Sequence, residues 1–443
     1  MKAAFFTFGC KLNQCETEAL AEAFEKQGFD IVEFSDPADV YVVNTCTVTS
    51  KSEQKARRVI RKTSRDYPES LVIVTGCYAQ LEPELIGELG DNVLSVALDR
   101  KDLIMDMAGF LGSGQSEGQE LYRSAGFWLE SQSPGIDESE GRFRFSAADF
   151  NFHARAFLKI QDGCDHRCAY CRVCLARGKS VSLSSDTLME RLKDLEAGGY
   201  EEVVLTGVNI DSYRDGSMNL SDLLHRIIEE TDHFRIRLSS LEPKTLLERD
   251  LSILSHPRIC SHFHVSAQSL SDSVLKRMNR PYGSQAVIDA VARLRELKDN
   301  PFIAADIIAG FPGETETEHN VTVTSLKQID FARIHVFPFS ARPDTAAWEM
   351  KPKIPERITG ERTEEIRGIS SKSYKNYLEQ QTDRTAQVLL EEEKKSGEDK
   401  FWEGTSDNYL RVRIPYSDEM KRGTLVSCRI VSEKNGTLYG KSE

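Results

Sequence analysis

Short apolar runs alternate with amphipathic stretches over the first 110 residues. The runs AFFTF, VYVVN and LVIVT are rich in β-branched and aromatic residues, which is typical of strands. After the first of them, ETEALAEAFEKQG places apolar residues at helical spacing and ends at Gly28, a residue common just past helix ends. Alternating strands and helices favour a parallel sheet, so we predict a compact α/β domain over residues 1–111.

The alternation resumes after a polar segment. Residues 112–150 are rich in Gly, Ser and acidic residues with little periodicity, which predicts a linker. Over residues 151–380, runs such as FLKI, VVLTG and FIAADIIAGF alternate with helical stretches, which favours a complete or partial (β/α) barrel of parallel strands. Residues 381–443 hold short β-prone runs between Gly, Asn and Asp turns, which predicts a small antiparallel β-barrel. The fold class is therefore α/β.

One loop of the predicted central barrel carries three closely spaced cysteines. Cys164, Cys168 and Cys171 form a C-x-x-x-C-x-x-C run within KIQDGCDHRCAYC. Three thiolates can hold three irons of a 4Fe-4S cluster and leave the fourth iron open to a ligand such as S-adenosylmethionine (SAM). The alternative is a zinc site, which needs four donors and would have to add Cys174 or His166.

Three further cysteines share another context, since Cys10, Cys46 and Cys77 each follow a short apolar run. The carboxyl ends of parallel strands meet at one edge of a sheet, where open α/β folds bind ligands. We therefore predict a second three-cysteine cluster site there. The alternative is three unrelated buried thiols. The remaining Cys15, Cys260 and Cys428 have no such context and are predicted to be packing residues.

Composition limits the class of protein and its partners. Ten cysteines in 443 residues are too few for a disulfide scaffold, and no signal peptide or long apolar span is visible, so we expect a cytoplasmic protein without a membrane segment. The net charge of −13 argues against a general nucleic-acid coat, so any RNA contact must be a local basic patch. The predicted C-terminal barrel offers aromatic and basic residues that suit RNA, or that are simply core and solvated surface: Trp402, Tyr409, Arg411 and Arg413.

Taken in order, the motifs resemble those of the radical SAM methylthiotransferases over almost the whole chain, including a C-terminal barrel like the TRAM domain of that family. The strings that carry the resemblance are GCKLNQ, NTCTVT, TGCYAQ, DGCDHRCAYC, ARGKS, LTGVNIDSY, SSLEP, RMNRPY, DIIAGFPGETE and FPFSARPDT. The first two, with GVNIDSY, look most like the branch that acts on N6-threonylcarbamoyladenosine beside the tRNA anticodon. Alternatives are the isopentenyladenosine branch, the ribosomal-protein aspartate branch, and a non-enzymatic iron-sulfur protein that binds RNA or carries electrons.

The resemblance implies two 4Fe-4S clusters, SAM, a tRNA substrate, a flavodoxin or ferredoxin electron donor, and a monomer. The cluster on Cys164, Cys168 and Cys171 would cleave SAM to a 5′-deoxyadenosyl radical, and that on Cys10, Cys46 and Cys77 would carry the sulfur. The SAM site would be formed by residues near the amino group (Gly207, Val208, Asn209), residues near the ribose (Ser239, Glu242), and Gln268, Gly310 and Phe311 in the same pocket. Arg177 and Arg342 are candidates for binding a substrate carboxylate or phosphate, with structural ion pairs as the alternative.

The sequence departs from the family pattern at three positions. Cys174 stands where a proline is usual, Leu270 where a glycine follows Gln-Ser, and Pro281 where a basic residue is common. If residue 270 needs a positive φ, leucine adds strain of roughly 1 to 2 kcal/mol beside the SAM pocket. Cys174 is expected to be a spare thiol, because a fourth ligand would close the iron that SAM needs.

Overall fold

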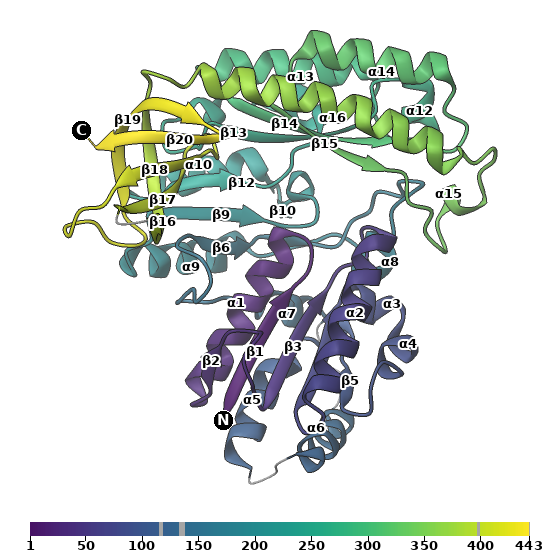
Figure 1. Ribbon diagram of the computed structural model, residues 1–443, viewed down its shortest axis with the longest axis vertical. Coiled ribbons are helices and arrows are strands. Elements are labelled where there is room, and N and C mark those ends of the chain that lie inside the picture. Colours follow the sequence, from purple (N-terminus) through teal and green to yellow (C-terminus); the bar gives the residue numbers. More distant parts are fainter. Residues whose placement is uncertain (115–117, 133–137, 397–398, 443) are drawn as a thin grey trace.

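The computed structural model describes residues 1–114, 118–132, 138–396 and 399–442. Figure 1 shows three parts, with the N-terminal sheet at the bottom, the central strands and their helices above it, and the C-terminal barrel at the upper left. The N-terminal and central parts share one hydrophobic core, in which Phe5 and Leu20 belong to the same cluster as Phe157 and Val204. They are therefore packed as one body.

The N-terminal part is a five-stranded sheet in the order β2-β1-β3-β4-β5, with every neighbouring pair parallel. The two central strands β3 and β4 are buried along their whole length, as expected of a parallel sheet covered on both faces. The predicted α/β domain is confirmed. Its strands are β1 (Lys2–Thr7), β2 (Asp30–Val32), β3 (Val40–Thr45), β4 (Leu71–Gly76) and β5 (Val93–Ser95); its helices are α1 (Lys11–Lys26), α2 (Ser50–Asp66), α3 (Cys77–Leu81), α4 (Pro83–Gly87), η1 (Leu98–Arg100) and α5 (Leu103–Ser113).

Residues 112–150, predicted to be a linker, contain two helices. These are α6 (Gln119–Ser131) and α7 (Glu138–Phe143). Leu121, Ala125 and Leu129 recur at helical spacing and are buried on α6, which packs on α5 and β5. Most of the segment therefore belongs to the N-terminal fold, because this narrow apolar stripe outweighs the polar flanks that suggested a linker.

The central part is a partial barrel of parallel strands, as predicted. Two three-stranded sheets, β12-β9-β6 and β13-β14-β15, are joined by parallel bridges between Ile236 and Ile259 and between Leu241 and Val265. Its strands are β6 (Ala156–Lys159), β9 (Glu202–Thr206), β12 (Arg235–Leu238), β13 (His262–Gln268), β14 (Phe302–Ala309) and β15 (Arg333–Pro338), with short pairs β7 (Gln161–Asp162), β8 (Val181–Ser182), β10 (Arg214–Asp215) and β11 (Met218–Asn219).

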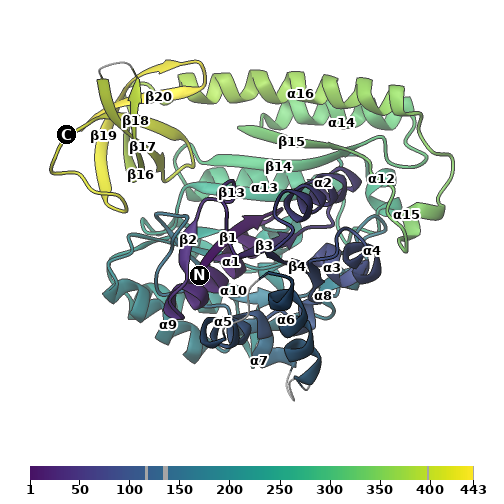
Figure 2. The same cartoon turned by 60° about the horizontal axis from the view of Figure 1, so that its bottom comes forward.

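Helices cover the outside of the partial barrel (Figures 1 and 2). No helix in the described ranges has both the length and the apolar character needed to cross a membrane. The helices are α8 (Val173–Arg177), α9 (Ser185–Ala197), η2 (Ile210–Ser212), α10 (Leu220–Glu230), α11 (Pro243–Glu248), η3 (Ser252–Ser255), α12 (Asp272–Arg277), α13 (Ser284–Leu297), α14 (Glu316–Ile329), α15 (Ala346–Glu349) and α16 (Glu356–Glu379).

The C-terminal part is a closed five-stranded barrel, but it is mixed rather than antiparallel. A ring with an odd number of strands must contain at least one parallel pair, and here β18 and β20 run parallel. The Asn435–Gly436 turn, with positive φ at both residues, joins the last two strands. The strands are β16 (Thr385–Ser396), β17 (Asp399–Ser406), β18 (Arg411–Pro415), β19 (Leu425–Lys434) and β20 (Thr437–Ser442).

Candidate active site

Three cysteines meet at the carboxyl edge of the N-terminal sheet. Cys10, Cys46 and Cys77 follow β1, β3 and β4, which are neighbours in the sheet and end in register. Burial, together with the nearby thiols of Cys10 and Cys77, raises the pKa of Cys46 to about 12. From β1 the chain continues to β2 on one side and then to β3 on the other, so the topological switch point of the sheet lies between β1 and β3. Open α/β sheets bind their ligands at this point. The predicted meeting of these cysteines is confirmed, while their role as cluster ligands stays a prediction.

The backbone beside Cys10 allows the thiols of Cys10 and Cys46 to approach each other closely. Gly9 has φ +95°, and a Cβ added there would lie 2.6 Å from the Sγ atom of Cys46. Only glycine leaves room for the two thiols to face the same space. The donor chemistry and this cradle both fit an iron-sulfur cluster, since iron in such clusters is held by cysteine thiolates.

Cys164, Cys168 and Cys171 line one cavity of about 450 Å³, together with Cys174. Burial raises the pKa of Cys164 to about 11 and that of Cys171 to about 12. A ligating sulfur must be a thiolate, so a cluster bound here has to displace these protons. The donor set fits a cluster with one iron left open.

The cysteine loop is held by the backbone of distant segments. The Cys164 N–H donates to the carbonyl of Gly178 at 3.0 Å, and the Ala169 N–H donates to the carbonyl of Met278 at 2.9 Å. The Ala169 carbonyl in turn accepts from Ala347 at 2.7 Å. The loop therefore has a fixed shape that depends on α8, α12 and α15.

The zinc alternative gains no support. Within the part of the chain that the structure describes, no three Cys, His, Asp or Glu side chains are grouped to hold a single metal ion. His166 instead has its Nδ1 atom 3.1 Å from Glu242 Oε1, and the Cys174 Sγ lies 3.9 Å from the carbonyl of Cys171. Cys174 lines the cavity as an additional thiol.

Replacing Gly163 by alanine is expected to prevent cluster assembly in this loop. Gly163 precedes Cys164 at φ +71°, and a Cβ there would lie 1.9 Å from the carbonyl oxygen of Lys179, so the loop would have to move. We expect reconstituted protein to lose the iron and sulfide of this site only. Gly199→Ala is the control, because Gly199 has φ +79° but open space around its Cβ position. It should cost only conformational strain of about 1 to 2 kcal/mol, and equal iron loss in both variants would contradict the explanation.

The predicted SAM residues lie at the carboxyl ends of the central strands. Gly207, Val208 and Asn209 follow β9, and the Asn209 N–H donates to Gln161 Oε1 at 2.8 Å. Ser239 follows β12 and donates to the carbonyl of Leu205 at 3.0 Å. All four are half-buried, and their contact with SAM stays a prediction.

Glu242 is tied to the cysteine loop by an arginine that the sequence analysis missed. The Arg280 guanidinium donates to Glu242 Oε1 at 2.8 Å and to Cys168 Sγ at 3.1 Å. Burial alone would raise the pKa of Glu242, but His166 and Arg280 outweigh it and hold that pKa below its usual value. The motif RMNRPY contains Arg280, but a surface role is equally compatible with its sequence.

The remaining predicted pocket residues differ in exposure. Gln268 ends β13 with φ 64° and is half-buried, while Gly310 has φ +76° and is buried. Phe311 is fully buried and packs edge-on against Tyr170 of the cysteine loop and against Phe339. Phe311 therefore supports the loop from the protein interior.

Leu270 does not carry the strain that its position suggested. The positive φ in this turn falls on Gln268, and Leu270 is not among the residues with positive φ. Its side chain is 1% exposed and packs in the main hydrophobic core. Leu270 is therefore a core residue without backbone strain.

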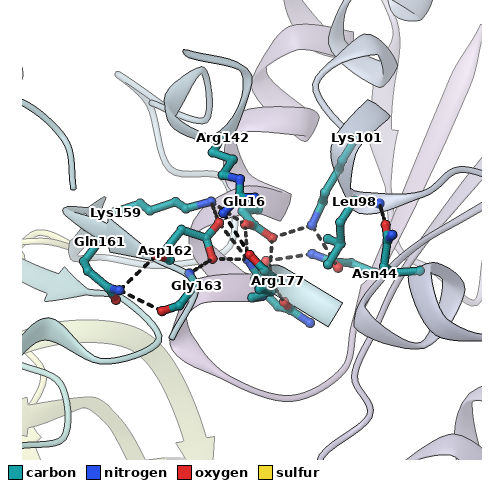
Figure 3. Close-up of polar contacts among 12 residues, drawn as sticks. Glu16, Asn44, Leu98, Lys101, Arg142, Lys159, Gln161, Asp162, Gly163 and Arg177 are labelled. Atoms are coloured by element: carbon teal, nitrogen blue, oxygen red, sulfur yellow. Dashed lines mark hydrogen bonds and ion pairs between the residues drawn. The ribbon is translucent and has the colours of Figure 1, made fainter. Parts of the chain in front are cut away.

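Arg177 lies in a buried network of charges between the N-terminal and central parts (Figure 3). Its guanidinium is 2.9 Å from Glu16 of α1 and 3.1 Å from Asp162 of β7. Lys101 and Lys159 also contact Glu16, at 2.5 and 2.8 Å. Each of these side chains is 1–5% exposed. The surroundings match the structural ion-pair alternative for Arg177 rather than a substrate contact.

Arg177 also connects the two cysteine sites. It ends α8, the helix that follows the cysteine loop, and α8 packs on α3, which begins with Cys77. Burial raises the pKa of Cys77, and a hydrogen bond from Arg177 opposes that rise. The network therefore fixes the position of the Cys10, Cys46 and Cys77 site relative to that of the Cys164, Cys168 and Cys171 site.

Arg342 is likewise occupied by protein groups. It forms an ion pair with Glu53 and donates to the hydroxyls of Thr47 at 2.8 Å and Ser50 at 3.0 Å. Its side chain is 2% exposed. Arg342 joins the segment after β15 to the turn before α2, again as a structural ion pair.

The C-terminal aromatic and basic residues do not form an open stacking surface. Trp402 is buried in the barrel core, and Tyr409 packs against Arg237 of the central part, 4.9 Å from its ring centre. Arg411 and Arg413 both pair with Glu403. Trp402 therefore matches the core alternative, and Arg411 and Arg413 are surface ion pairs, whereas Tyr409 is an aromatic that stays 38% exposed.

Two family models match the chain. The radical SAM superfamily matches residues 158–325, and an uncharacterized protein family, UPF0004, matches residues 2–97. The solved structure of TsrM, a radical S-adenosylmethionine methyltransferase from Kitasatospora setae, aligns with a TM-score of 0.51 at 14% identity and covers 78% of this chain and 77% of that one. It supports the fold alone.

Two curated relatives extend over most of the chain. A Geobacter metallireducens protein named tRNA-2-methylthio-N(6)-dimethylallyladenosine synthase is 30% identical over 98% of this chain and 97% of its own length. A Treponema pallidum protein named threonylcarbamoyladenosine tRNA methylthiotransferase MtaB is 39% identical over 87% of this chain and 90% of its own length. With both family models, this similarity shows that the chain belongs to the radical S-adenosylmethionine methylthiotransferase family.

Proposed function

We propose that this enzyme places a methylthio group on carbon 2 of N6-threonylcarbamoyladenosine, beside the anticodon of tRNA, in the cytoplasm. The strings GCKLNQ, NTCTVT and GVNIDSY support this substrate, as does the name of the 39% identical relative. The observation that carries the proposal is the pair of cysteine triplets. Cys164, Cys168 and Cys171 line one cavity, and Cys10, Cys46 and Cys77 follow neighbouring strands at one edge of the N-terminal sheet, which α3 and α8 join to the cysteine loop.

The cysteine loop would hold one 4Fe-4S cluster on Cys164, Cys168 and Cys171, which when bound supplies an open iron for SAM and the electron that cleaves it. Cys10, Cys46 and Cys77 would hold the second cluster, the carrier of sulfur. A flavodoxin or ferredoxin would be the electron donor, and the chain would act as a monomer.

The chain's own residues orient these parts. His166 and Arg280 keep Glu242 ionised, and Arg280 holds it in place, so that its other oxygen can accept hydrogen bonds from ribose hydroxyls of SAM. The same guanidinium donates to the Cys168 sulfur, and hydrogen bonds to cluster sulfurs tune the potential of a bound cluster. Gly207 and Gly310 allow close packing of the chain behind the proposed SAM site, since a Cβ would lie 2.8 Å from the carbonyl oxygen of Gln161 at the first and would collide with the Thr359 side chain at the second.

Replacing Arg280 by glutamine is expected to weaken SAM binding. A charge-assisted hydrogen bond contributes about 1.5 to 3 kcal/mol, so we expect SAM affinity of the reconstituted enzyme to fall roughly ten- to a hundredfold. Equilibrium dialysis measures this directly. Arg277→Gln is the matched control, because Arg277 lies three residues away and pairs with Glu318 instead. If SAM affinity were equal in the two variants, Arg280 would have no part in placing Glu242.

The proposed substrate is tested with two defined tRNAs. Purified, reconstituted and reduced enzyme is given SAM and tRNA that carries either N6-threonylcarbamoyladenosine or N6-dimethylallyladenosine, and the nucleosides are analysed by mass spectrometry. We expect the methylthio product from the first tRNA. Product from the second alone would assign the chain to the activity named for the Geobacter relative.

A further inference from the structure

Helix α2 concentrates positive charge in a chain of net charge −13. Its 17 residues carry seven basic side chains and two acidic ones. By contrast, residues 381–443 carry eleven basic and twelve acidic residues, so the C-terminal barrel is close to neutral. Charge therefore distinguishes α2 as the surface to which a polyanion would be drawn.

The basic side chains of α2 point away from the protein. Ala56 and Ile60 are buried against the N-terminal sheet, while the basic residues recur at helical spacing on the other side. They border an open hollow in the surface lined only by α2: Lys51, Gln54, Lys55, Arg57, Arg58, Arg61, Lys62 and Arg65. We call this set the α2 basic face.

The charge of this face is mostly uncompensated. Of the two acidic residues of α2, Glu53 points inward to Arg342, and Asp66 pairs with Lys62 and Arg65 at the far end. In the ranges that the structure covers, Lys51, Lys55, Arg58 and Arg61 have no ion-pair partner. Four cations in the first three turns are thus free to bind an external anion.

The α2 basic face begins at the candidate active site. Ser50, the first residue of α2, is four residues after Cys46, and its hydroxyl is 2.8 Å from that of Ser340 in the segment after β15. Figure 1 shows α2 along the N-terminal sheet, where it packs on β3 and β4. A long anion bound along α2 would therefore reach the edge of the two cysteine sites.

We propose that the α2 basic face binds the phosphate backbone of the tRNA substrate, an inference that rests on the proposed function. The helix is about 25 Å long at 1.5 Å per residue, so it spans several phosphates of an RNA strand. A membrane-binding helix would instead expose an apolar side, whereas the apolar side of α2 is buried in the core. The α2 basic face would then supply an electrostatic share of RNA binding.

The test compares two triple variants of the full-length, reconstituted enzyme. Lys55→Gln, Arg58→Gln and Arg61→Gln remove three unpaired charges of the α2 basic face. Arg357→Gln, Arg367→Gln and Lys372→Gln make the same change in net charge on exposed positions of α16. Affinity for tRNA is measured by fluorescence anisotropy over a series of salt concentrations, with SAM cleavage in the absence of tRNA as the folding control.

We expect the α2 variant to bind tRNA about tenfold more weakly at low salt and to lose about two to three units of the slope of log K against log salt, while cleaving SAM as the wild type does. The α16 variant should lose less than half as much. Equal losses in the two variants, or none, would overturn the role of α2 and leave the proposed function standing. Wild-type enzyme that does not bind tRNA would overturn both. Binding to phosphatidylserine vesicles that α2 substitution abolishes, with tRNA affinity unchanged, would assign the face to a membrane surface instead.

Discussion

Replacing Cys164, Cys168 and Cys171 together by alanine is expected to reduce SAM cleavage to the level of a protein-free reaction. These three thiols line one cavity, and without them no iron can present an open coordination site to SAM. Alanine at Cys10, Cys46 and Cys77 should instead leave SAM cleavage in place and abolish transfer of the methylthio group. Formation of 5′-deoxyadenosine and of methylthiolated nucleoside measures the two steps separately.

Cys174→Ala is the control for these cysteine variants, since its thiol lines the same cavity but is expected to be spare. It should keep both steps and full iron content. Loss of cleavage in Cys174→Ala would make this thiol a ligand, and loss of cleavage in both triple variants would contradict the division of work between the two sites.

Replacing Glu16 by glutamine is expected to destabilise the protein by about 3 to 5 kcal/mol, the cost of leaving buried charges unpaired. Glu16 contacts Lys101, Lys159 and Arg177, all of them at most 3% exposed, and of these cations Lys159 and Arg177 also pair with Asp162. The cations also hold the pKa of Glu16 well below its usual range, against the effect of burial. Urea unfolding of the anaerobic protein measures the change in free energy.

Glu25→Gln on the same helix serves as the reference for this substitution. Its side chain is exposed and accepts a hydrogen bond from Asn151 at 3.3 Å, so its loss should cost at most about 0.5 kcal/mol. A similar unfolding free energy for the two variants would mean that the network adds nothing to the joining of the N-terminal and central parts.

The cysteine sites were predictable because each depends on local sequence. An apolar strand followed by cysteine recurs three times, and parallel strands bring their ends to one edge, so the position of Cys10, Cys46 and Cys77 follows from chain order alone. The C-x-x-x-C-x-x-C loop is contiguous in sequence. Its shape, however, depends on Met278 and Ala347, more than a hundred residues away, which no local pattern reveals.

The role of individual charged residues was not predictable. Arg177 and Arg342 suit an anionic substrate by residue type, but the structure surrounds them with Glu16, Asp162 and Glu53 from distant segments. Arg280 was missed because its partners, Cys168 and Glu242, come from two other loops. Tertiary packing decides which buried charges pair with one another, and the sequence shows only that the charged residues exist.

Some structural elements differed from the prediction, because a weak apolar pattern lay within a segment of strongly polar composition or because one residue type suited two roles. The buried stripe of α6 was hidden among Gly, Ser and acidic residues, and Trp402 was compatible with both core and RNA contact until packing placed it in the barrel core. The parallel pair of the barrel follows from its five strands, a number that short β-prone runs do not fix.

The proposed function is tested most directly by mass spectrometry of the tRNA nucleosides from a strain that lacks this protein. We predict that 2-methylthio-N6-threonylcarbamoyladenosine disappears, that N6-threonylcarbamoyladenosine accumulates, and that a plasmid encoding the wild-type chain restores the methylthio form while the triple alanine variant at Cys10, Cys46 and Cys77 does not. An unchanged level of the methylthio nucleoside, or loss of the dimethylallyl derivative in its place, would contradict the account.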